Sequence, residues 1–481
     1  MSTLLETLPD EIWPGHGTAR LINGYATDKG MLQRVNIRAD KKLSTTTFLQ
    51  LATNQLDECC EKESPRDCLL SGFTTLVRFP MVCENRKVTA AVIAEFSGDR
   101  SQIIEQCSIE LLNRNPVSSN KVTFQQTDTG QSVVICMATW EPDAEHFKRQ
   151  IESIKAQTLA TWHCIINDDA SSNESWLRIQ DIVGDDSRFS LFRNENNLGF
   201  YRNFEVALSR VPEEADFVAL ADQDDDWYPD KLEACVAAFN DEVTLAYCDM
   251  RVVDEQAGVV SETYWTGRKN NFKDAEVLFL ANTVTGAASV FRRDLLDDIL
   301  PFPQAVGQVF HDHWIACVAR CRGNLAYVDR TLYDYYQYGN SVIGHCDFEA
   351  KGAAQRGLEM AARVKHLARP AKFKPWLIDK RISALNVFHH EYLRLFLFSE
   401  ILKIRLPGMN KDAARGLRMF SASWPAIFYL VAAHVRIVFK KETTDDAEMR
   451  LAAAVFMFKF DRLVGHLFAG RIVKKQCRSQ S

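Results

Sequence analysis

Five aspartates follow a short apolar run near the middle of the chain. The stretch ALADQDDDWYPDKL, residues 219–232, places them at positions 222, 224, 225, 226 and 230. Carboxylates held close together repel one another unless a cation lies between them. Mg²⁺ takes one or two carboxylates and completes its shell with water and phosphate oxygens, and Mn²⁺ favours the same oxygen ligands. Asp222 and Asp224 are therefore candidates for a site that binds a metal ion and phosphates, with a solvated acidic loop as the alternative.

The later part of this run has a simpler explanation. Pro229 suits the first turn of a helix, and the helix dipole favours Asp226 and Asp230 near the N-terminus of that helix. The first two aspartates of the run lie too far upstream for this explanation. Asp225 is open to two interpretations, support of the neighbouring carboxylates and exposure to solvent.

The segments before the run predict an α/β domain. A continuous apolar run at 132–138 is typical of a strand buried on both faces, and a second buried strand is expected at 162–168. Amphipathic helical segments alternate with these strands. This alternation predicts a mostly parallel sheet, in which ligands bind beyond the carboxyl ends of the strands. The acidic run and the pair Asp168-Asp169 both follow such strands. We therefore expect them to share one crevice.

Residues 1–125 precede this α/β domain, which we expect to span 126–348. Segments at 73–80 and 88–96 have the composition of strands, and the segment at 102–114 has that of a helix. They predict a small α+β or β-rich module, to which the sequence assigns no role.

The last region, 349–481, is expected to be helical and is strongly basic. Residues 351–481 carry 25 lysines and arginines against 10 acidic residues, whereas the whole chain has 57 against 63. The stretches 421–438 and 452–468 mix bulky apolar residues with Arg and Lys, as helices at a membrane surface do. The uncharged part, 421–435, is shorter than the roughly 20 residues of a spanning helix. We expect attachment to a membrane surface rather than nucleic-acid binding, because no motif that reads RNA or DNA accompanies the charge.

Cysteine usage and the N-terminus indicate the compartment. The 13 cysteines are scattered and form no CxxC pair, which is typical of reduced thiols in the cytosol. The first 17 residues have neither the basic start nor the apolar segment of a secretory signal. The expected localisation is cytoplasmic, at the inner face of the cell membrane.

Six short motifs occur in a fixed order along the chain. They are MATW at 137–140, NDDAS at 167–171, NENNLGFYRNF at 194–204, ADQDDDWYPDKL at 221–232, TGAASVFRR at 285–293 and HDHW at 311–314. The series resembles the family 2 glycosyltransferases of the GT-A fold. The greatest similarity is to bacterial rhamnosyltransferase-like members, whose acidic motif is DQDDxWxPDKL. The resemblance covers about residues 131–345 and implies the Rossmann-like GT-A fold, with a mostly parallel sheet.

The resemblance also implies a role for each matching residue. Four residues would hold the nucleobase of a nucleotide-sugar donor: Ala138, Thr139, Trp140 and Asp169. Arg202 would approach the diphosphate, Asp222 would lie near the ribose, and Asp224 would coordinate Mg²⁺ or Mn²⁺. Asp312 would be the general base that takes a proton from the acceptor hydroxyl. Without the resemblance, Asp312 is a helix cap.

The implied reaction is an inverting transfer of a sugar, with rhamnose as a candidate, to a growing bacterial surface glycan or a lipid-linked acceptor. The QxxRW motif of processive enzymes does not occur in the chain, which favours the addition of one or a few sugars. Two alternatives stay open. A nucleotidyltransferase would need a Gly/Arg/Lys-rich phosphate loop, which MATWEPD does not supply. A catalytically silent glycan-binding or scaffolding subunit would not need the general base.

One segment departs from the family pattern. Related sequences often end this domain with YRxHxxN, whose histidine can help to hold the metal ion. The corresponding YYQYGNSVIG, residues 335–344, has Tyr336, Tyr338 and Ser341 in place of the arginine, histidine and asparagine. Water or phosphate would then complete the metal shell, or metal affinity would be weak. His311 and His345 are possible substitutes.

Overall fold

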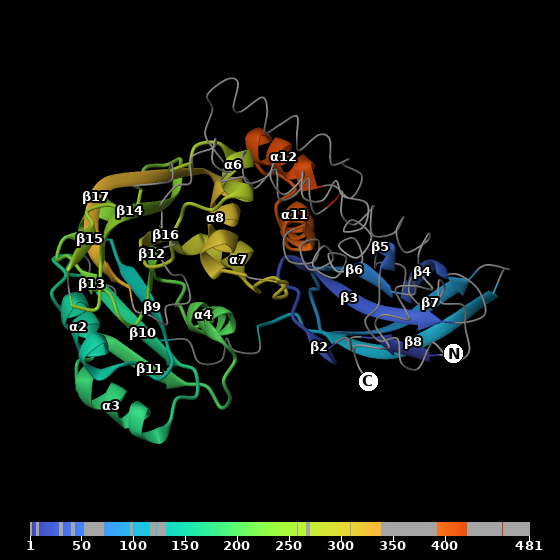
Figure 1. Cartoon of the computed structure of the whole chain (residues 1–481), viewed down its shortest axis with the longest axis horizontal. Helices are drawn as coiled ribbons and strands as arrows, with labels where there is room; N and C mark the ends of the chain where they lie inside the picture. Colours follow the sequence, from blue (N-terminus) through green and yellow to red (C-terminus); the bar gives the residue numbers. More distant parts are fainter. Residues whose placement is uncertain are drawn as a thin grey trace, which may run out of the picture.

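The structure is a computed structural model of the 481-residue chain. It describes residues 2–5, 9–27, 32–39, 44–51, 72–96, 100–115, 122, 131–256, 258–265, 270–307, 309–337, 392–420 and 455. These residues form a β-sandwich, a larger α/β domain, and two helices, α11 and α12, that pack beside the α/β domain (Figure 1).

The N-terminal region is a sandwich of two four-stranded sheets. The sheets have the strand orders β1 (Ser2–Leu5), β3 (Gly17–Thr27), β6 (Gly72–Pro80), β5 (Ser44–Leu51) and β2 (Glu11–Ile12), β8 (Arg100–Leu111), β7 (Arg86–Phe96), β4 (Leu32–Ala39). Apolar side chains such as Ile22, Phe79 and Val92 form a core of their own. The β-rich form of the predicted N-terminal module is therefore the observed one.

The helix predicted at 102–114 is wrong, whereas the strands predicted at 73–80 and 88–96 are confirmed as β6 and β7. β8 pairs antiparallel with β7 along its length. Ile109 and Leu111 are buried, and Glu110 between them is partly exposed. This alternation has the period of two that a strand facing a core requires.

The α/β domain is built on one mixed sheet. Its order is β11 (Phe189–Arg193), β10 (Trp162–Asp168), β9 (Val133–Thr139), β12 (Phe217–Ala221), β16 (Ser289–Arg292), β14 (Val243–Val253), β17 (Asn324–Tyr336) and β13 (Asp226–Trp227), with β15 (Val259–Ser261) beside β14. The four strands β11, β10, β9 and β12 run parallel, as predicted. β16 is antiparallel to both of its neighbours, and only β14 and β17 are parallel in the other half.

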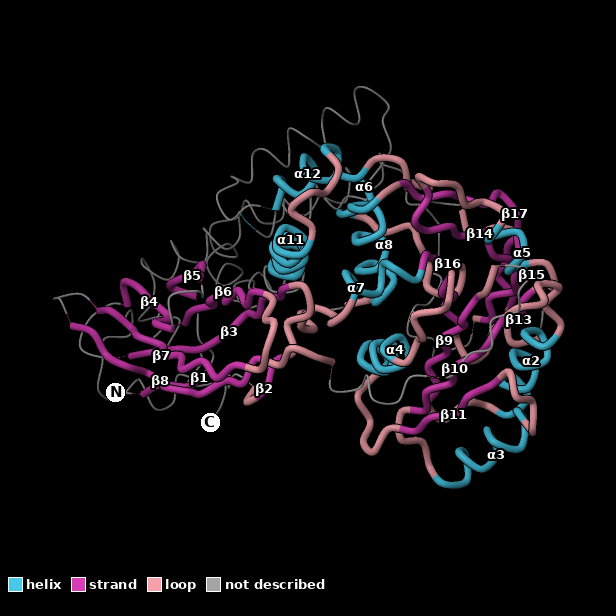
Figure 2. The backbone as a smooth tube through the Cα atoms, turned by 180° about the vertical axis from the view of Figure 1, so that it is seen from behind, coloured by secondary structure: helices cyan, strands magenta, loops and turns pink. Residues whose placement is uncertain are grey.

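Helices pack on both faces of the parallel strands. The helices of the domain are α2 (Ala144–Lys155), α3 (Asn173–Val183), α4 (Phe200–Ser209), α5 (Lys231–Val236), α6 (Ala275–Leu280), α7 (Leu296–Ile299) and α8 (His311–Arg322). α2 and α3 lie on one side of β9 and β10, and α4 lies on the other side (Figures 1 and 2). Phe147, Ile151 and Ile154 of α2 are buried, which confirms the predicted apolar face of this helix. Burial on both faces explains why β9 and β12 are almost entirely apolar and why all of β10, including its polar residues His163, Asn167 and Asp168, is buried.

Helix α11 (Arg394–Arg405) connects the sandwich to the α/β domain. It packs against β3 and β6 of the sandwich and against α8 (Figure 2). At its end the buried guanidinium of Arg405 donates to the carbonyl oxygens of Gly17 in the sandwich, at 2.6 Å, and of Pro301 in the α/β domain, at 2.8 Å. This one side chain therefore links three parts of the chain.

Helix α12 (Lys411–Leu417) packs on α6 and α8, and its Ala413 and Leu417 belong to the main core. The helical prediction for the C-terminal region is thus confirmed for the described part, and both described helices belong to the packed core. The stretches 421–438 and 452–468, predicted to meet a membrane, lie outside the described residues apart from position 455. Within the described part of the chain, no helix combines the length and the apolar character needed to cross a bilayer.

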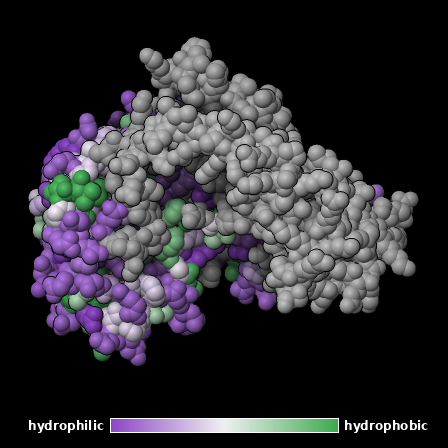
Figure 3. Space-filling view, viewed as in Figure 1, coloured by the Kyte–Doolittle hydropathy of each residue, from purple (hydrophilic) through white to green (hydrophobic). Residues whose placement is uncertain are grey.

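The described surface of the α/β domain is mostly hydrophilic on the face shown in Figure 3. A small hydrophobic patch lies over β15, where Val259 and Val260 are about half exposed. Such a small patch is ordinary for a protein surface.

Candidate active site

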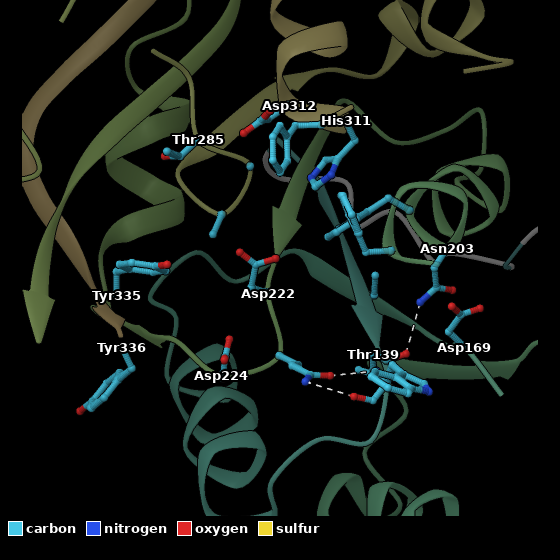
Figure 4. A pocket seen from close by; sticks show the side chains of 18 of the residues that line it. Thr139, Asp169, Asn203, Asp222, Asp224, Thr285, His311, Asp312, Tyr335 and Tyr336 are labelled. Atoms are coloured by element: carbon cyan, nitrogen blue, oxygen red, sulfur yellow. Dashed lines mark hydrogen bonds between the residues drawn. The ribbon is translucent and has the colours of Figure 1, made fainter. Parts of the chain in front are cut away.

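A pocket of about 590 Å³ lies beyond the carboxyl ends of β9 and β12, where ligands bind in parallel sheets (Figure 4). Its walls come from the loops after these two strands, the starts of α4 and α8, and the end of β17. The predicted site residues that line it are Ala138, Thr139, Trp140, Asp169, Asp222, Asp224 and Asp312. The structure therefore brings the two acidic clusters and Asp312 into one crevice, as the sequence predicted.

The loop after β9 is tied to the acidic loop after β12. The backbone N–H of Trp140 donates to Gln223 Oε1 at 2.9 Å, and Gln223 Nε2 donates to the Trp140 carbonyl at 3.3 Å. Trp140 is 57% exposed and lines the pocket. This arrangement offers a flat aromatic surface beside the acidic loop.

The buried carboxylate of Asp169 organises the turn that starts α4. It accepts hydrogen bonds from the backbone N–H groups of Leu198 and Gly199 and from the Asn194 side chain, each at 2.8 Å. Gly199 has a φ of +78°, a conformation that favours glycine. Asp169 lines the pocket, and these contacts show that it also positions the pocket wall.

Asn203 is a positioning residue that the sequence analysis did not single out. Its amide donates to the carbonyl oxygens of Asn167 and Thr139 at 2.9 and 3.3 Å, and its Oδ1 accepts from Asn167 Nδ2 at 2.7 Å. It thereby joins α4 to the ends of β9 and β10. The sequence feature that could have identified Asn203 is a polar residue next to Phe204 on the mostly apolar face of a helix.

Arg202 is the predicted site residue that the structure does not bring to the pocket. Its guanidinium pairs with Glu205 one turn further along α4 and points to the carbonyl oxygen of Pro303, at 3.3 Å. The physical reason is helical geometry, since consecutive residues project about 100° apart and Asn203 takes the inward direction. The predicted contact of Arg202 with a diphosphate is therefore not supported by its position.

Arg149 of α2 brings a positive charge to the acidic loop instead. Its Nη2 donates to the backbone carbonyl of Asp224 at 2.6 Å, and its guanidinium lies 3.5 Å from the ring centroid of Tyr336. Tyr336 occupies the position where the family pattern has an arginine. Position 336 therefore carries no positive charge, and Arg149 of α2 supplies one instead. The sequence motif could not reveal this, because α2 lies far from position 336 in the sequence.

The acidic loop holds its carboxylates in an environment that opposes ionisation. Burial and, next, the charge of Asp222 raise the pKa of Asp224 to about 7, while Arg149 opposes this shift. Burial also raises the pKa of Asp222 and of Asp225. Asp225 is only 1% exposed, and its Oδ2 has no hydrogen-bond partner among the described residues. Of the two interpretations of Asp225, exposure to solvent is wrong.

Lys231 supplies a buried positive charge beneath the same loop. Its Nζ donates to the carbonyl oxygen of Ala287 and lies 3.3 Å from the ring centroid of Trp227. Burial lowers the pKa of Lys231 to about 8, and the nearby carboxylates of Asp225 and Asp222 oppose the shift. Lys231 is part of the DQDDxWxPDKL motif, but the sequence alone did not show that it is buried.

The helix predicted behind Pro229 exists as α5, with Asp230 at its N-cap position. The Asp230 side chain makes no capping bond and pairs with Arg330 at 2.6 Å. The helix explanation of Asp226 is wrong, because this residue lies in β13, opposite Asp334 of β17. The pairing of β13 with β17 fixes the far end of the acidic loop.

Asp312 lies in the first turn of α8. The N-cap position belongs to Phe310, so the alternative role of Asp312 as the helix cap is wrong. In Figure 4 the carboxylate of Asp222 lies between those of Asp312 and Asp224. His311, beside Asp312, is buried and stacks on Phe204 with 3.9 Å between ring centroids. Burial lowers the pKa of His311 to about 3, so its imidazole is neutral at physiological pH.

The residues present fit an open metal site, in which phosphate and water supply some of the ligands, better than a site in which side chains supply all of them. Among the described residues no group of three or more His, Cys, Asp and Glu side chains is arranged to hold a metal ion. Asp222 and Asp224 nevertheless offer two carboxylates, with raised pKa values, in one pocket. Mg²⁺ and Mn²⁺ accept such a pair together with phosphate and water oxygens. Tyr338, Ser341 and His345 lie outside the described residues.

Comparison with known proteins agrees with this geometry. Residues 132–300 match the family model described as glycosyl transferase family 2. An uncharacterized glycosyltransferase of Methanocaldococcus jannaschii is 26% identical over 193 residues, which are 39% of this chain and 64% of that protein. An uncharacterized glycosyltransferase of Haemophilus influenzae is 25% identical over 47% of this chain and 71% of that protein. The match with the first of these relatives thus spans less than two thirds of its length.

Two solved structures align with the chain at low similarity. Residues 1–349 of S. aureus TarS in complex with UDP-GlcNAc align with a TM-score of 0.40 and 13% identity, over 69% of this chain and 91% of that one. The mannosyltransferase PcManGT from Pyrobaculum calidifontis, in complex with GDP-Man and Mn²⁺, aligns with a TM-score of 0.36 and 15% identity, over 70% of this chain and 90% of that one.

The class of protein follows from the sheet and the family match. Within the α/β domain, residues 132–300 are a glycosyl transferase family 2 domain, and the mixed sheet with helices on both faces agrees with the GT-A fold. The family resemblance found in the sequence motifs is thereby confirmed.

Proposed function

We propose that the chain is an inverting glycosyltransferase that moves a sugar from a nucleoside-diphosphate sugar to a hydroxyl group of a glycan or lipid-linked acceptor. The observation that carries this proposal is the pocket in which Asp222 and Asp224 lie together with Asp312, at the end of the parallel strands of a family 2 domain. Rhamnose is a candidate for the sugar, on the resemblance of the DQDDxWxPDKL motif alone.

The donor nucleotide would lie between the loops after β9 and β12. Trp140 offers an exposed ring for a nucleobase, and the Ala138–Thr139 strand end and Asp169 complete this part of the wall. The diphosphate would lie against the acidic loop. Two positive charges lie near that loop: Arg149, which donates to the backbone carbonyl of Asp224, and Lys231. They offset part of the repulsion between the carboxylates and the phosphates.

Asp224, with Asp222 beside it, would hold Mg²⁺ or Mn²⁺. Such an ion, when bound, acts as a Lewis acid that stabilises the negative charge of the departing diphosphate. The raised pKa values of both carboxylates support this assignment, because a cation relieves the repulsion that causes part of the shift in Asp224.

Asp312 would act on the acceptor. Its carboxylate takes the proton of the acceptor hydroxyl while that oxygen forms a bond to the anomeric carbon. The bond between the anomeric carbon and the diphosphate oxygen breaks on the opposite face, so the anomeric configuration inverts. Tyr335 and Thr285, which line the pocket near Asp312 and Asp222 in Figure 4, would border the space between donor and acceptor.

The C-terminal region would bring the enzyme to its acceptor. The 25 basic against 10 acidic residues in 351–481 favour contact with an anionic lipid surface, at the inner face of the cell membrane. A lipid-linked acceptor would make such contact useful.

Replacement of Asp312 tests the proposal. Asp312→Asn keeps the size of the side chain and removes the base, so the rate of sugar transfer should fall by about 10²- to 10⁴-fold. The dissociation constant of the nucleotide-sugar donor, measured by calorimetry, should stay within about twofold of the wild-type value, since uncharged asparagine leaves the donor wall intact. Asp294→Asn, an exposed position close to α7, is the control.

An Asp312→Asn variant that transfers sugar at the wild-type rate would exclude Asp312 as the base. Unchanged function of this variant in cells, together with a wild-type protein that transfers no sugar, would favour the silent glycan-binding subunit. Release of pyrophosphate from a nucleoside triphosphate would instead favour the nucleotidyltransferase.

A further inference from the structure

His311 is a buried polar side chain of the pocket that the proposed reaction does not use. It is the first residue of α8, it lines the pocket, and it is 7% exposed. Neither Nδ1 nor Nε2 has a hydrogen-bond partner among the residues that the structure describes. Buried polar groups nearly always have hydrogen-bond partners. Two nitrogens without partners in a pocket wall therefore indicate that a ligand supplies these partners.

Carbon contacts fix the orientation of the His311 ring. Phe204 stacks on it at 3.9 Å with 26° between the ring planes, and Phe200 approaches at 6.4 Å edge to face. On another side, a Cβ atom added to Gly286 would lie only 2.8 Å from Nε2. The glycine of the TGAAS motif therefore leaves room for the ring, and the ring is held without any hydrogen bond.

The chemistry of the ring selects among ligands. A neutral imidazole presents one donor and one acceptor on opposite sides, which matches hydroxyl groups that both donate and accept. Burial keeps the pKa of His311 far below neutrality, so the ring does not offer the positive charge that a phosphate prefers. A metal ion is not favoured, because no group of three suitable side chains is arranged around one in the described chain.

Aromatic rings beside His311 suit the same ligand. Phe200 is 44% exposed and lies 6.0 Å from Phe310, with both rings in the pocket wall. The carbon-bound hydrogens of a sugar ring pack well on such surfaces, while its hydroxyl groups need polar partners. The wall thus combines apolar faces with one donor and one acceptor, next to Asp312.

We propose that His311 recognises the hydroxyl groups of a bound saccharide, in a subsite walled by Phe200, Phe204, Phe310 and Gly286. This inference rests on the proposed function for the presence of a saccharide beside Asp312. The saccharide is either the sugar of the donor or the acceptor, and both offer the same hydroxyl chemistry.

The test compares four variants of the full chain. His311→Phe keeps a ring and removes both hydrogen-bonding groups, whereas His311→Gln keeps a donor and an acceptor. His313→Phe is the matched control, because His313 is equally buried in the same helix but packs against Phe398, outside the pocket. Thermal unfolding checks that each variant is folded. Gly286→Ala pushes the ring aside without removing it and provides a second route if His311→Phe does not fold.

Two affinities are measured for each protein. Calorimetry compares UDP with UDP-glucose, GDP with GDP-mannose, and dTDP with dTDP-rhamnose, and a glycan array reports binding of free saccharides. We expect His311→Phe to lose about tenfold in saccharide-dependent affinity, His311→Gln to retain most of it, and nucleoside diphosphates to bind all variants alike.

Each outcome decides the inference. A loss confined to the nucleotide sugars assigns His311 to the donor sugar, and a loss confined to the array assigns it to the acceptor. If His311→Phe matches wild type and His313→Phe in both assays, or loses only Mn²⁺ affinity, the inference is overturned. A wild-type protein that binds array glycans but no nucleotide sugar contradicts the proposed transfer and still allows the His311 comparison. A wild-type protein that binds neither contradicts both.

Discussion

The carboxylates of Asp222, Asp224 and Asp225 lie at the end of β12 with less water around them than charged groups normally need. The same burial acts in the opposite sense on His311, since it disfavours whichever form is charged. The pocket therefore contains acids that hold protons more tightly than usual and a histidine that holds its proton less tightly. A cation would favour the ionised acids, and the neutral histidine suits an uncharged ligand.

The shift at His311 predicts how stability depends on pH. Its pKa is about 3 in the folded chain and 6.5 in the unfolded chain. Between these values the unfolded state binds a proton that the folded state does not, so the free energy of unfolding falls as pH drops from 6.5 towards 3. This contribution is on the order of 1 kcal/mol per pH unit within the window and is fully present above pH 6.5.

Urea unfolding of wild type and His311→Phe at pH 4 to 7 measures this contribution. The variant cannot titrate at position 311, so its stability should change less across this range than that of the wild type. If the free energies of unfolding of the two proteins fall in parallel as the pH drops, folded His311 is protonated as readily as unfolded His311, and the prediction is wrong.

The residues that the sequence could identify are those at strand ends. Asp222, Asp224 and Asp312 follow from motifs, because a residue just after a buried strand or at a helix start has a nearly fixed position. Arg149 and Asn203 could not be identified, since the direction of a side chain on a helix depends on how that helix packs. The direction of Arg202, towards Glu205 and Pro303, could not be predicted for the same reason.

At the scale of secondary structure, the acidic loop is held from several sides. β12 precedes it, β13 pairs with β17 behind it, and Lys231 of α5 reaches under it to Ala287. Arg149 of α2 holds the backbone of Asp224. These restraints keep the carboxylates together despite their repulsion, which is a condition for a ready cation site.

The end of α11 carries the clearest prediction on stability. Arg405 donates to the carbonyl oxygens of Gly17, Asp298, Ile299 and Pro301, and burial lowers its pKa to about 10. Arg405→Met removes this donor from all four carbonyl oxygens, of which that of Ile299 keeps the N–H of Trp314, and should lower the free energy of unfolding by about 3 kcal/mol or more. Urea denaturation measures the change.

Arg415→Met on α12 serves as the control for Arg405. Its ion pairs with Asp412 and Glu276 are mostly exposed, so its loss should change stability by less than about 1 kcal/mol. Equal effects of the two substitutions would contradict the role of Arg405 as the link between the sandwich and the α/β domain.

Secondary structure was predictable where one periodicity dominates. The apolar runs of β9 and β12, the buried strand β10 and the apolar face of α2 correspond to the predicted elements. β8 was not predictable as a strand, because its polar side chains weaken the alternation until its pairing with β7 is known. The packing of α11 between two units also depends on contacts far apart in the sequence.

For the whole molecule, the described chain is a β-sandwich and a GT-A domain joined through α11. The basic stretches that follow α12 are the part for which we propose membrane contact. Because α11 and α12 belong to the core, a truncation at about residue 350 would disturb folding as well as localisation. Point substitutions beyond position 420 are the better test.

Replacement of Arg436, Lys440 and Lys441 by alanine should weaken binding to vesicles that contain anionic lipid. Each charge near the surface contributes about 1 kcal/mol, so three should lower the partition coefficient by roughly 100-fold at low salt. Sedimentation with phosphatidylserine vesicles measures it, with Lys440→Arg and Lys441→Arg as the control that keeps the charge. Equal sedimentation of the alanine variant and wild type would contradict membrane contact through these residues.

The central claim is that the pocket binds a nucleoside-diphosphate sugar together with a divalent cation at Asp224. The most direct measurement is a thermal-shift series of nucleotide sugars, with and without Mn²⁺, on wild type and Asp224→Asn. A donor at 100 times its dissociation constant stabilises the folded state by about 2.7 kcal/mol, which raises Tm by several degrees. We predict such a shift for at least one nucleotide sugar, larger with Mn²⁺ in the wild type and insensitive to Mn²⁺ in Asp224→Asn. The account is contradicted if no nucleotide sugar changes Tm, or if Asp224→Asn responds to Mn²⁺ as the wild type does.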